Sequence, residues 1–218
     1  MRHTMNQDIL GKIQNFFDGE TKTLARGEML ILPGQQPPGV SFLVEGMVEQ
    51  YDITPEGNKI TVNIFKPPAF FPMSWAINKT PNDYFFAALS EVKLKRAPAD
   101  AAVAFLQQNP DVAFDLLSRV YKGTDALLKR LLFAARGVAS TRLIFELLIE
   151  AYRFGDDADD GKKLIRVKHG QLADRTGLAR ETVSRELHKL ANDGLVMLTK
   201  KGIVMDLDRL QQRLDVSV

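Results

Sequence analysis

The sequence predicts an α+β protein with a β sandwich or barrel first, a long amphipathic helix second and a winged helix-turn-helix last. Three observations support this order. Strand-length apolar runs separated by turn residues fill residues 20–100, a helical repeat begins after Pro98, and two short helices followed by a hairpin pattern occupy residues 169–205. The expected domains are 1–108, 109–137 and 138–218.

The first half is a series of short strands. Glycine and proline punctuate apolar runs at 28–32, 40–44, 47–53 and 60–65. The turn at 55–58 predicts a hairpin, and the alternation of Ile60, Val62 and Ile64 predicts a strand with one buried face. Two further strands are expected near 84–90 and 92–96.

A helical repeat follows, in which apolar residues recur every three or four positions between Phe114 and Val138. The helix could lie along its own β domain or pair with a second copy of the chain. Pairing is favoured because the apolar face is longer than one small β domain can cover. The predicted dimer contacts are Leu117, Tyr121, Thr124, Leu128, Leu131 and Ala135. A second helix at 141–154 precedes a solvated, aspartate-rich loop at 155–161.

The most specific motif is HGQLADRTGLARETVSRELHKL, residues 169–190. Gly177 suits the tight turn between two helices, and the small Ala173 lets them approach closely. Val183, Leu187 and Leu190 are spaced to face inward on the second helix. Two strands joined by the basic turn 199–202 follow, as in a wing.

The outward face of that second helix carries the candidate DNA contacts. Arginine can donate two hydrogen bonds to guanine, glutamate can accept one from cytosine, and serine and lysine can hold phosphates. The candidates are Arg180, Glu181, Ser184, Arg185, His188 and Lys189, with Lys200 and Lys201 at the hairpin tip. They predict double-stranded DNA as the partner. The alternative is a helical hairpin that only packs in a core.

A β-rich domain, a long helix and a winged helix-turn-helix in this order resemble the CRP/FNR family of transcription regulators. The segments FLVEGMVEQYDITPEGNKITV (42–62) and GLARETVSREL (177–187) carry the resemblance. It implies a β-roll of the jelly-roll, cyclic nucleotide-binding type, a dimerisation helix, and a homodimer on a near-palindromic site. It also implies RNA polymerase as a partner and TTGA-like half-sites read by Glu181, Ser184 and Arg185. Glu186 departs from the family pattern, which has an apolar residue there.

The sequence departs from the cyclic-AMP-binding members of that family. They carry a Gly-Glu pair and an Arg-Ser/Thr-Ala segment, where this chain has Phe71-Pro72-Met73-Ser74 and Asp83-Tyr84-Phe85-Phe86-Ala87. An aspartate flanked by aromatic residues would repel a phosphate, so no cyclic AMP is expected. The absence of cysteine excludes a cysteine-held iron–sulfur cluster.

The remaining expectation for the β domain is a small apolar or aromatic effector. Its predicted lining is Phe71, Met73, Trp75, Tyr84, Phe86, Tyr121 and Lys122. Two alternatives stay open. These aromatic residues could simply fill the core, or the protein could be an effector-independent, constitutive or architectural DNA-binding protein.

Composition excludes several other classes of protein. The chain has 218 residues, 45% of them apolar and 26% charged, with a net charge of +2. No apolar stretch approaches the roughly 20 residues that span a bilayer, so a cytoplasmic protein without membrane contact is expected. Residues 4–168 hold no histidine, and the glycine-rich nucleotide and serine-hydrolase motifs are absent. Neither a metal site nor an enzyme is therefore expected.

Overall fold

The computed structural model describes residues 5–216 and the side chains of residues 5–214. The chain forms two compact units, residues 5–122 and 123–216, which divide inside helix α4 (Pro110–Ala135). The α+β prediction, with a β domain, a long helix and a helix-turn-helix, is confirmed. The three domains 1–108, 109–137 and 138–218 stay predictions.

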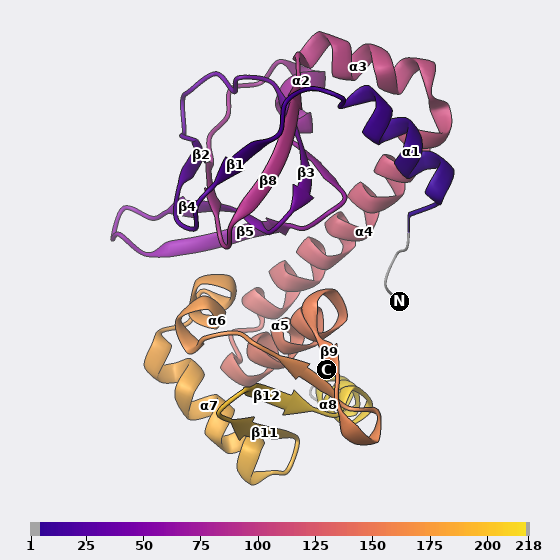
Figure 1. Ribbon diagram of the computed structural model, residues 1–218. Coiled ribbons are helices and arrows are strands. Elements are labelled where there is room, and N and C mark those ends of the chain that lie inside the picture. Colours follow the sequence, from indigo (N-terminus) through magenta and orange to yellow (C-terminus); the bar gives the residue numbers. More distant parts are fainter. Residues whose placement is uncertain (1–4, 217–218) are drawn as a thin grey trace. The chain divides into compact units, whose positions relative to one another are not determined.

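The first unit is a β-roll of two antiparallel, four-stranded sheets (Figure 1). One sheet has the order β1-β8-β3-β6 and the other β2-β7-β4-β5. The strands are β1 (Lys22–Leu24), β2 (Met29–Ile31), β3 (Val40–Glu45), β4 (Val48–Ile53), β5 (Lys59–Phe65), β6 (Ala69–Phe71), β7 (Phe85–Ala88) and β8 (Val92–Ala97). The helices are α1 (Gln7–Phe16), α2 (Met73–Asn78), α3 (Ala99–Gln108) and the start of α4. Sequence patterns did not predict α1 or α2.

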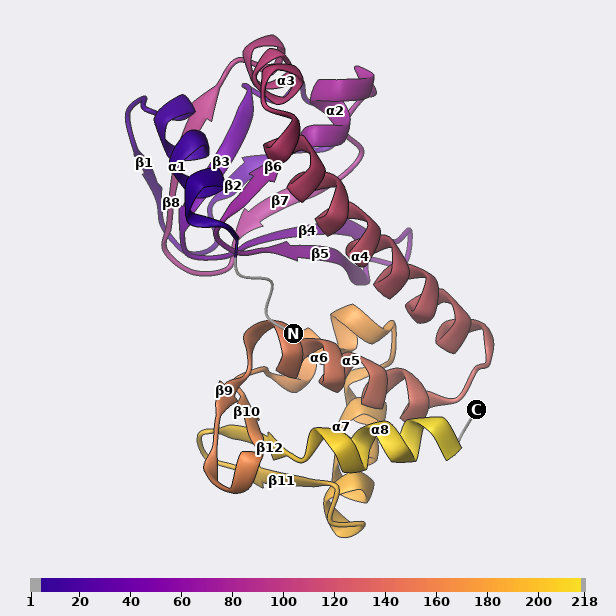
Figure 2. The same ribbon diagram turned by 90° about the vertical axis from the view of Figure 1, so that its right-hand side faces the viewer.

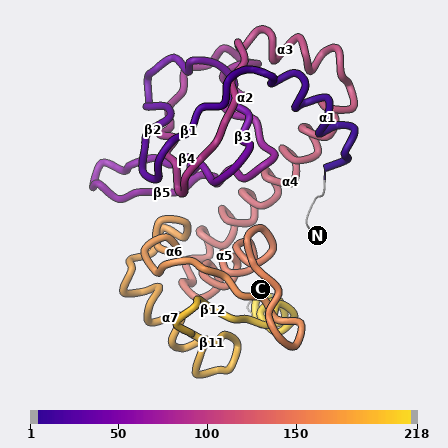
Figure 3. Tube along the Cα trace, viewed as in Figure 1, coloured from indigo at the N-terminus to yellow at the C-terminus, as the bar shows by residue number. Residues whose placement is uncertain are grey.

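The predicted hairpin at 55–58 is confirmed by the pairing of β4 with β5, which extends furthest from the roll in Figure 3. The predicted alternation along β5 is wrong, because Ile60 is exposed and Thr61 is buried. Thr61 lies opposite Tyr51 and Asn63 opposite Gln50, so Val62 is an extra residue. Such a bulge reverses the faces of the residues beyond it.

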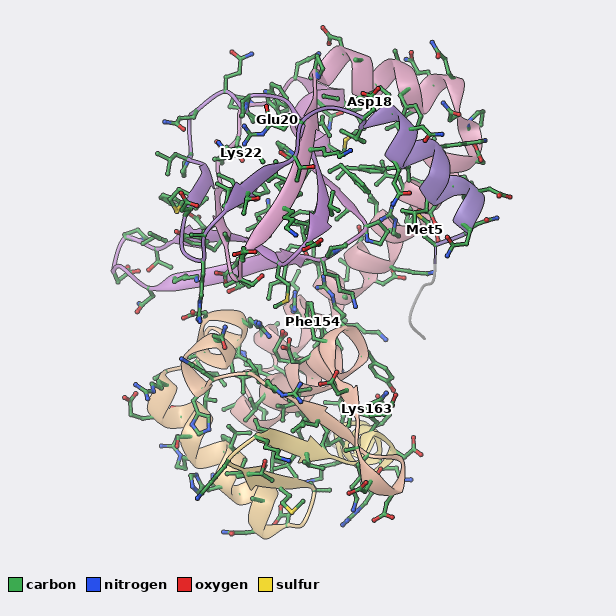
Figure 4. All side chains as sticks on the ribbon, viewed as in Figure 1. Met5, Asp18, Glu20, Lys22, Phe154 and Lys163 are labelled. Atoms are coloured by element: carbon green, nitrogen blue, oxygen red, sulfur yellow. The ribbon has the colours of Figure 1, made fainter. Side chains whose placement is uncertain are left out.

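The roll is filled by apolar side chains, as the stick view in Figure 4 shows. Phe71 and Phe86 lie between the sheets, with stacked rings whose centroids are 5.6 Å apart. A second cluster joins the roll to α1 and α3, where Phe16 stacks on Phe105 at 4.3 Å. The roll core is therefore densely occupied by aromatic rings.

The second unit packs a small sheet against helices (Figure 2). Its elements are the end of α4, α5 (Ala139–Phe154), β9 (Asp156–Asp157), a 3-10 turn (Asp159–Gly161), β10 (Lys163–Ile165), α6 (His169–Thr176), α7 (Arg180–Asn192), β11 (Val196–Thr199), β12 (Gly202–Met205) and α8 (Leu207–Val216). The sheet order is β11-β12-β10-β9. Helix α8, which was not predicted, contributes Leu210 and Leu214 to the core.

The aspartate-rich segment after α5 is more ordered than the predicted loop. Strand β9 pairs with β10, and Asp156 and Asp157 form ion pairs with Arg166 and Lys163. The aspartates remain exposed, but lysine and arginine neutralise part of their charge. Cross-strand pairing of opposite charges explains why this polar segment forms a strand.

Candidate nucleic-acid interface

The predicted helix-turn-helix is formed by α6 and α7. Gly177 ends α6 in the left-handed conformation, at φ 66° and ψ 23°, a region that favours glycine. The backbone N–H of Lys168 donates to Oε1 of Gln171 at 2.9 Å and caps the start of α6. The turn chemistry of the sequence thus fixes where α6 begins and ends.

Helix α7 is divided into two faces. Val183, Leu187 and Leu190 are buried in one core with Leu172 of α6, as the sequence predicted. On the other side the side chains are exposed, apart from the partly buried Ser184; they are Arg180, Glu181, Arg185, His188 and Lys189. The predicted DNA-contacting residues of the helix therefore lie on the solvent-facing side of a rigidly packed element.

Arg185 is held only loosely. Its side chain is 61% exposed, with Nη2 at 3.4 Å from Oγ1 of Thr182 and Nε at 3.7 Å from Oε1 of Glu186. Contacts this long are weak, so the guanidinium can turn to another acceptor at small cost.

Two features at the start of these helices were not predicted. Ala179, the N-cap of α7, has no side-chain oxygen to accept from the N–H groups of the first turn. Helix N-termini of this kind attract phosphates. His169 begins α6, and its pKa is lowered by partial burial, by His188 and by Arg180. Arg180 therefore places a positive charge near His169, whose lowered pKa favours the neutral ring. Neither feature has a specific sequence signal.

The wing is a tight β-hairpin between β11 and β12. Oγ1 of Thr199 accepts from the backbone N–H groups of Lys201 and Gly202, at 3.2 and 3.1 Å. A Cβ on Gly202 would lie 2.1 Å from the carbonyl oxygen of Ile165, so only glycine fits there. Lys200 and Lys201 are exposed at the tip, where the sequence places them.

Glu186, the residue that departs from the family pattern, lies on the inner edge of α7. It is only 8% exposed, and its Oε1 accepts from Nζ of Lys189 at 2.8 Å. The ammonium of Lys189 therefore balances the negative charge of Glu186 within α7. Leu187 and Leu190 are still buried in the core.

The predicted effector residues are not brought together. Phe71 and Phe86 fill the roll, Met73 and Trp75 pack on the second cluster, and Tyr84, Tyr121 and Lys122 are exposed. A small cavity near α1 and α3 has about 10 Å³ of free volume. That is space for no more than one water molecule, and Met73 is the one predicted residue in its lining.

The predicted dimer contacts all lie exposed on α4: Leu117, Tyr121, Thr124, Leu128, Leu131 and Ala135. Neighbouring apolar side chains, Phe114, Val120, Leu127 and Leu132, are exposed as well. We call the six predicted contacts and these four neighbours the α4 stripe. An apolar stripe of this length is unusual on a monomer surface.

Within residues 5–216, no helix combines the length and the apolar character needed to cross a membrane. The same residues contain no cluster of three histidine or carboxylate side chains that could hold a metal ion.

Comparisons with known proteins match both units. The family model of the cyclic nucleotide-binding domain matches residues 21–109, and that of the Crp-like helix-turn-helix domain matches residues 141–213. The global nitrogen regulator of Synechocystis sp. is 29% identical over 191 residues, which cover 84% of this chain and 83% of the relative.

Solved structures share the fold. TTHA1359, a CRP/FNR-family transcriptional regulator from Thermus thermophilus, has a TM-score of 0.72 and 24% identity, covering 90% of this chain and 98% of that one. A CooA mutant from Carboxydothermus hydrogenoformans has a TM-score of 0.79 and 16% identity, covering 97% and 98%. With its two domains in this order, the chain belongs to the CRP/FNR family of DNA-binding transcription regulators, a family of regulators and not of enzymes.

Proposed function

We propose that the protein binds a near-palindromic DNA site as a homodimer, with α7 of each copy in a major groove. The division of α7 into a buried apolar face and an exposed polar face is the main support. The α4 stripe supplies an apolar surface for a second copy. Two-fold symmetry would then place the half-sites about one helical turn apart.

Each exposed side chain has a proposed part in recognition. Arg185 donates to guanine, Glu181 accepts from a cytosine amino group, and Ser184 completes the reading of a TTGA-like half-site. The phosphate contacts are Arg180, His188, Lys189, Lys200 and Lys201. RNA polymerase is the proposed protein partner of the bound dimer, as the family resemblance implies.

The test begins with selection of duplexes from a randomised pool by the wild-type protein. Arg185→Ala should weaken binding to the selected site by about 1–3 kcal/mol and relax discrimination at one base pair. Lys201→Ala, the matched control, should weaken selected and scrambled duplexes alike. Equal losses on all sequences for both variants would contradict base reading by Arg185, and failure to select any palindrome would contradict the proposal itself.

For the β-roll we propose a small apolar or aromatic effector and no cyclic nucleotide in the family's usual mode. An exposed Asp83 beside Tyr84, in the segment where cyclic-AMP-binding members carry arginine, supports the exclusion. Cyclic AMP should leave the melting temperature unchanged; a rise with cyclic AMP would contradict this. Native mass spectrometry of the dimer after exposure to cell extract should reveal the effector.

A second candidate is DNA binding without any effector, controlled by protein abundance. The stacked Phe71 and Phe86 favour it, because they occupy the roll interior that a ligand would need. Purified protein that binds its selected site fully, and gains nothing from cell extract, would support this candidate.

A further inference from the structure

Helix α5 carries two buried glutamates one turn apart, and each is paired with an arginine of a different helix. Glu146 accepts two hydrogen bonds from Arg130 of α4, from Nε and Nη2, both at 2.9 Å. Glu150 pairs with Arg175 of α6, and both of those side chains are less than 10% exposed. All four residues belong to the unit 123–216.

Burying these charged side chains costs free energy, because they lose their contacts with water. Burial raises the pKa of Glu150 and Glu146 raises it further, and Arg175 and Arg153 offset this only in part. Buried ion pairs of this kind often add little stability compared with apolar residues of similar size. Two adjacent pairs within a mainly apolar core, with Arg153 of α5 close to both, therefore suggest a role other than stability.

The first pair fixes the end of α4 against α5. Phe133 contacts Phe145 of α5 with ring centroids 4.9 Å apart, which gives a second contact between the same helices. Leu128, two residues before Arg130, is about 200° away around the helix and exposed. The end of α4 thus has one face bound to α5 and one face that belongs to the α4 stripe.

The second pair fixes α6 against α5. Leu172 of α6 shares its core with Val183 and Leu187 of α7, so a displacement of α6 would move α7 as well. Glu150 accepts a hydrogen bond from Nη1 of Arg175, whereas Glu146 accepts two from the guanidinium of Arg130. Hydrogen-bonded ion pairs fix direction as well as distance, unlike non-directional apolar contacts. An unbroken chain of contacts therefore runs from the α4 stripe through α5 and α6 to α7.

We propose that Arg130–Glu146 and Glu150–Arg175 are positioning pairs that fix the recognition helix relative to the dimer face of α4. They would determine which spacing between half-sites the dimer accepts, without touching DNA. This inference rests on the proposed homodimer and its palindromic site.

The test uses the full-length double variant Arg130→Met/Glu146→Leu, which removes one charge of each sign and leaves Glu150 beside Arg175 and Arg153. Its affinity is measured for the palindrome selected by the wild type, for the same palindrome with one base pair inserted or removed at the centre, and for a single half-site. The preference for the selected spacing should fall by about threefold to thirtyfold, while half-site affinity stays unchanged. Glu150→Leu/Arg175→Leu should give the same pattern.

The matched control is Asp157→Asn/Lys163→Met, which removes an exposed ion pair of the same net charge between β9 and β10. It should leave the spacing preference unchanged. If both core variants keep the wild-type spacing preference, the inference is overturned and the proposed function stands. The same holds if they lose affinity equally for every duplex. A wild type without any preference for palindromes would overturn the proposed function and this inference together.

Discussion

The two units fill their interiors differently. Between the sheets of the β-roll the core is mainly apolar, with Phe71 and Phe86 at its centre. A buried carboxylate of the roll, Glu49 of β4, pairs with Lys59 of the neighbouring strand β5. In the DNA-binding unit, α5 buries Glu146 and Glu150 among leucines. Apolar attraction is non-directional, whereas a hydrogen-bonded ion pair between helices also sets the direction of one helix against another. The comparison suggests that buried ion pairs between separate helices define helix positions in the DNA-binding unit.

The largest effect is expected in the roll. Phe71→Ala should lower the free energy of unfolding by about 3–5 kcal/mol, because it leaves a cavity beside Phe86. The affinity of the remaining folded protein for DNA should not change. Chemical denaturation and binding titration measure the two quantities. Ile77→Ala, at an exposed position of α2, is the control. Its free energy of unfolding should stay within about 0.5 kcal/mol of the wild-type value.

In the DNA-binding unit, Glu150→Leu alone should cost about 3 kcal/mol of stability, because Arg175 is left buried without its partner. The double variant Glu150→Leu/Arg175→Leu should recover most of that loss. The denaturant midpoints of the single and the double variant measure the two losses of stability. A double variant no more stable than the single one would mean that the ion pair itself stabilises the unit.

Exposed ion pairs should behave differently from the buried ones. Lys79 and Asp100 form a pair whose side chains are 62% and 90% exposed. Lys79→Met should therefore change stability by less than about 1 kcal/mol, and the effect should shrink at high salt. A loss as large as that of Glu150→Leu would remove the distinction between exposed and buried pairs.

The smallest effect concerns pH. The pKa of His169 is lowered in the folded state, so the folded protein resists its protonation. The stability provided by neutral His169 is present above the unfolded pKa of about 6.5, and it is lost as the pH falls through the lower folded pKa. The wild-type melting temperature should therefore drop more than that of His169→Gln on acidification. His188→Gln should reduce this difference, because His188 contributes to the lowered pKa.

Features that depend on a few neighbouring residues were predicted correctly, and features that depend on the pairing of distant segments were not. Gly177, the basic turn at Lys200 and Lys201, and the inward spacing of Val183 and Leu187 act within a few residues, so the sequence located them correctly. The face of β5 was predicted wrongly, because the bulge at Val62 depends on pairing with β4. The predicted effector residues do not lie together: Phe71 ends β6 and Met73 begins α2, so residues close in sequence join different clusters.

By itself the sequence determined the order of the domains, the helix-turn-helix and the residues on its outer face, because periodicity and turn chemistry are local properties of a chain. Only the tertiary structure decided that Phe71 and Phe86 stack in the roll interior and that Arg130 and Arg175 meet the glutamates of α5. Those contacts join residues 16 and 25 positions apart on separate helices. Their formation depends on how whole helices pack, which no short stretch of sequence specifies.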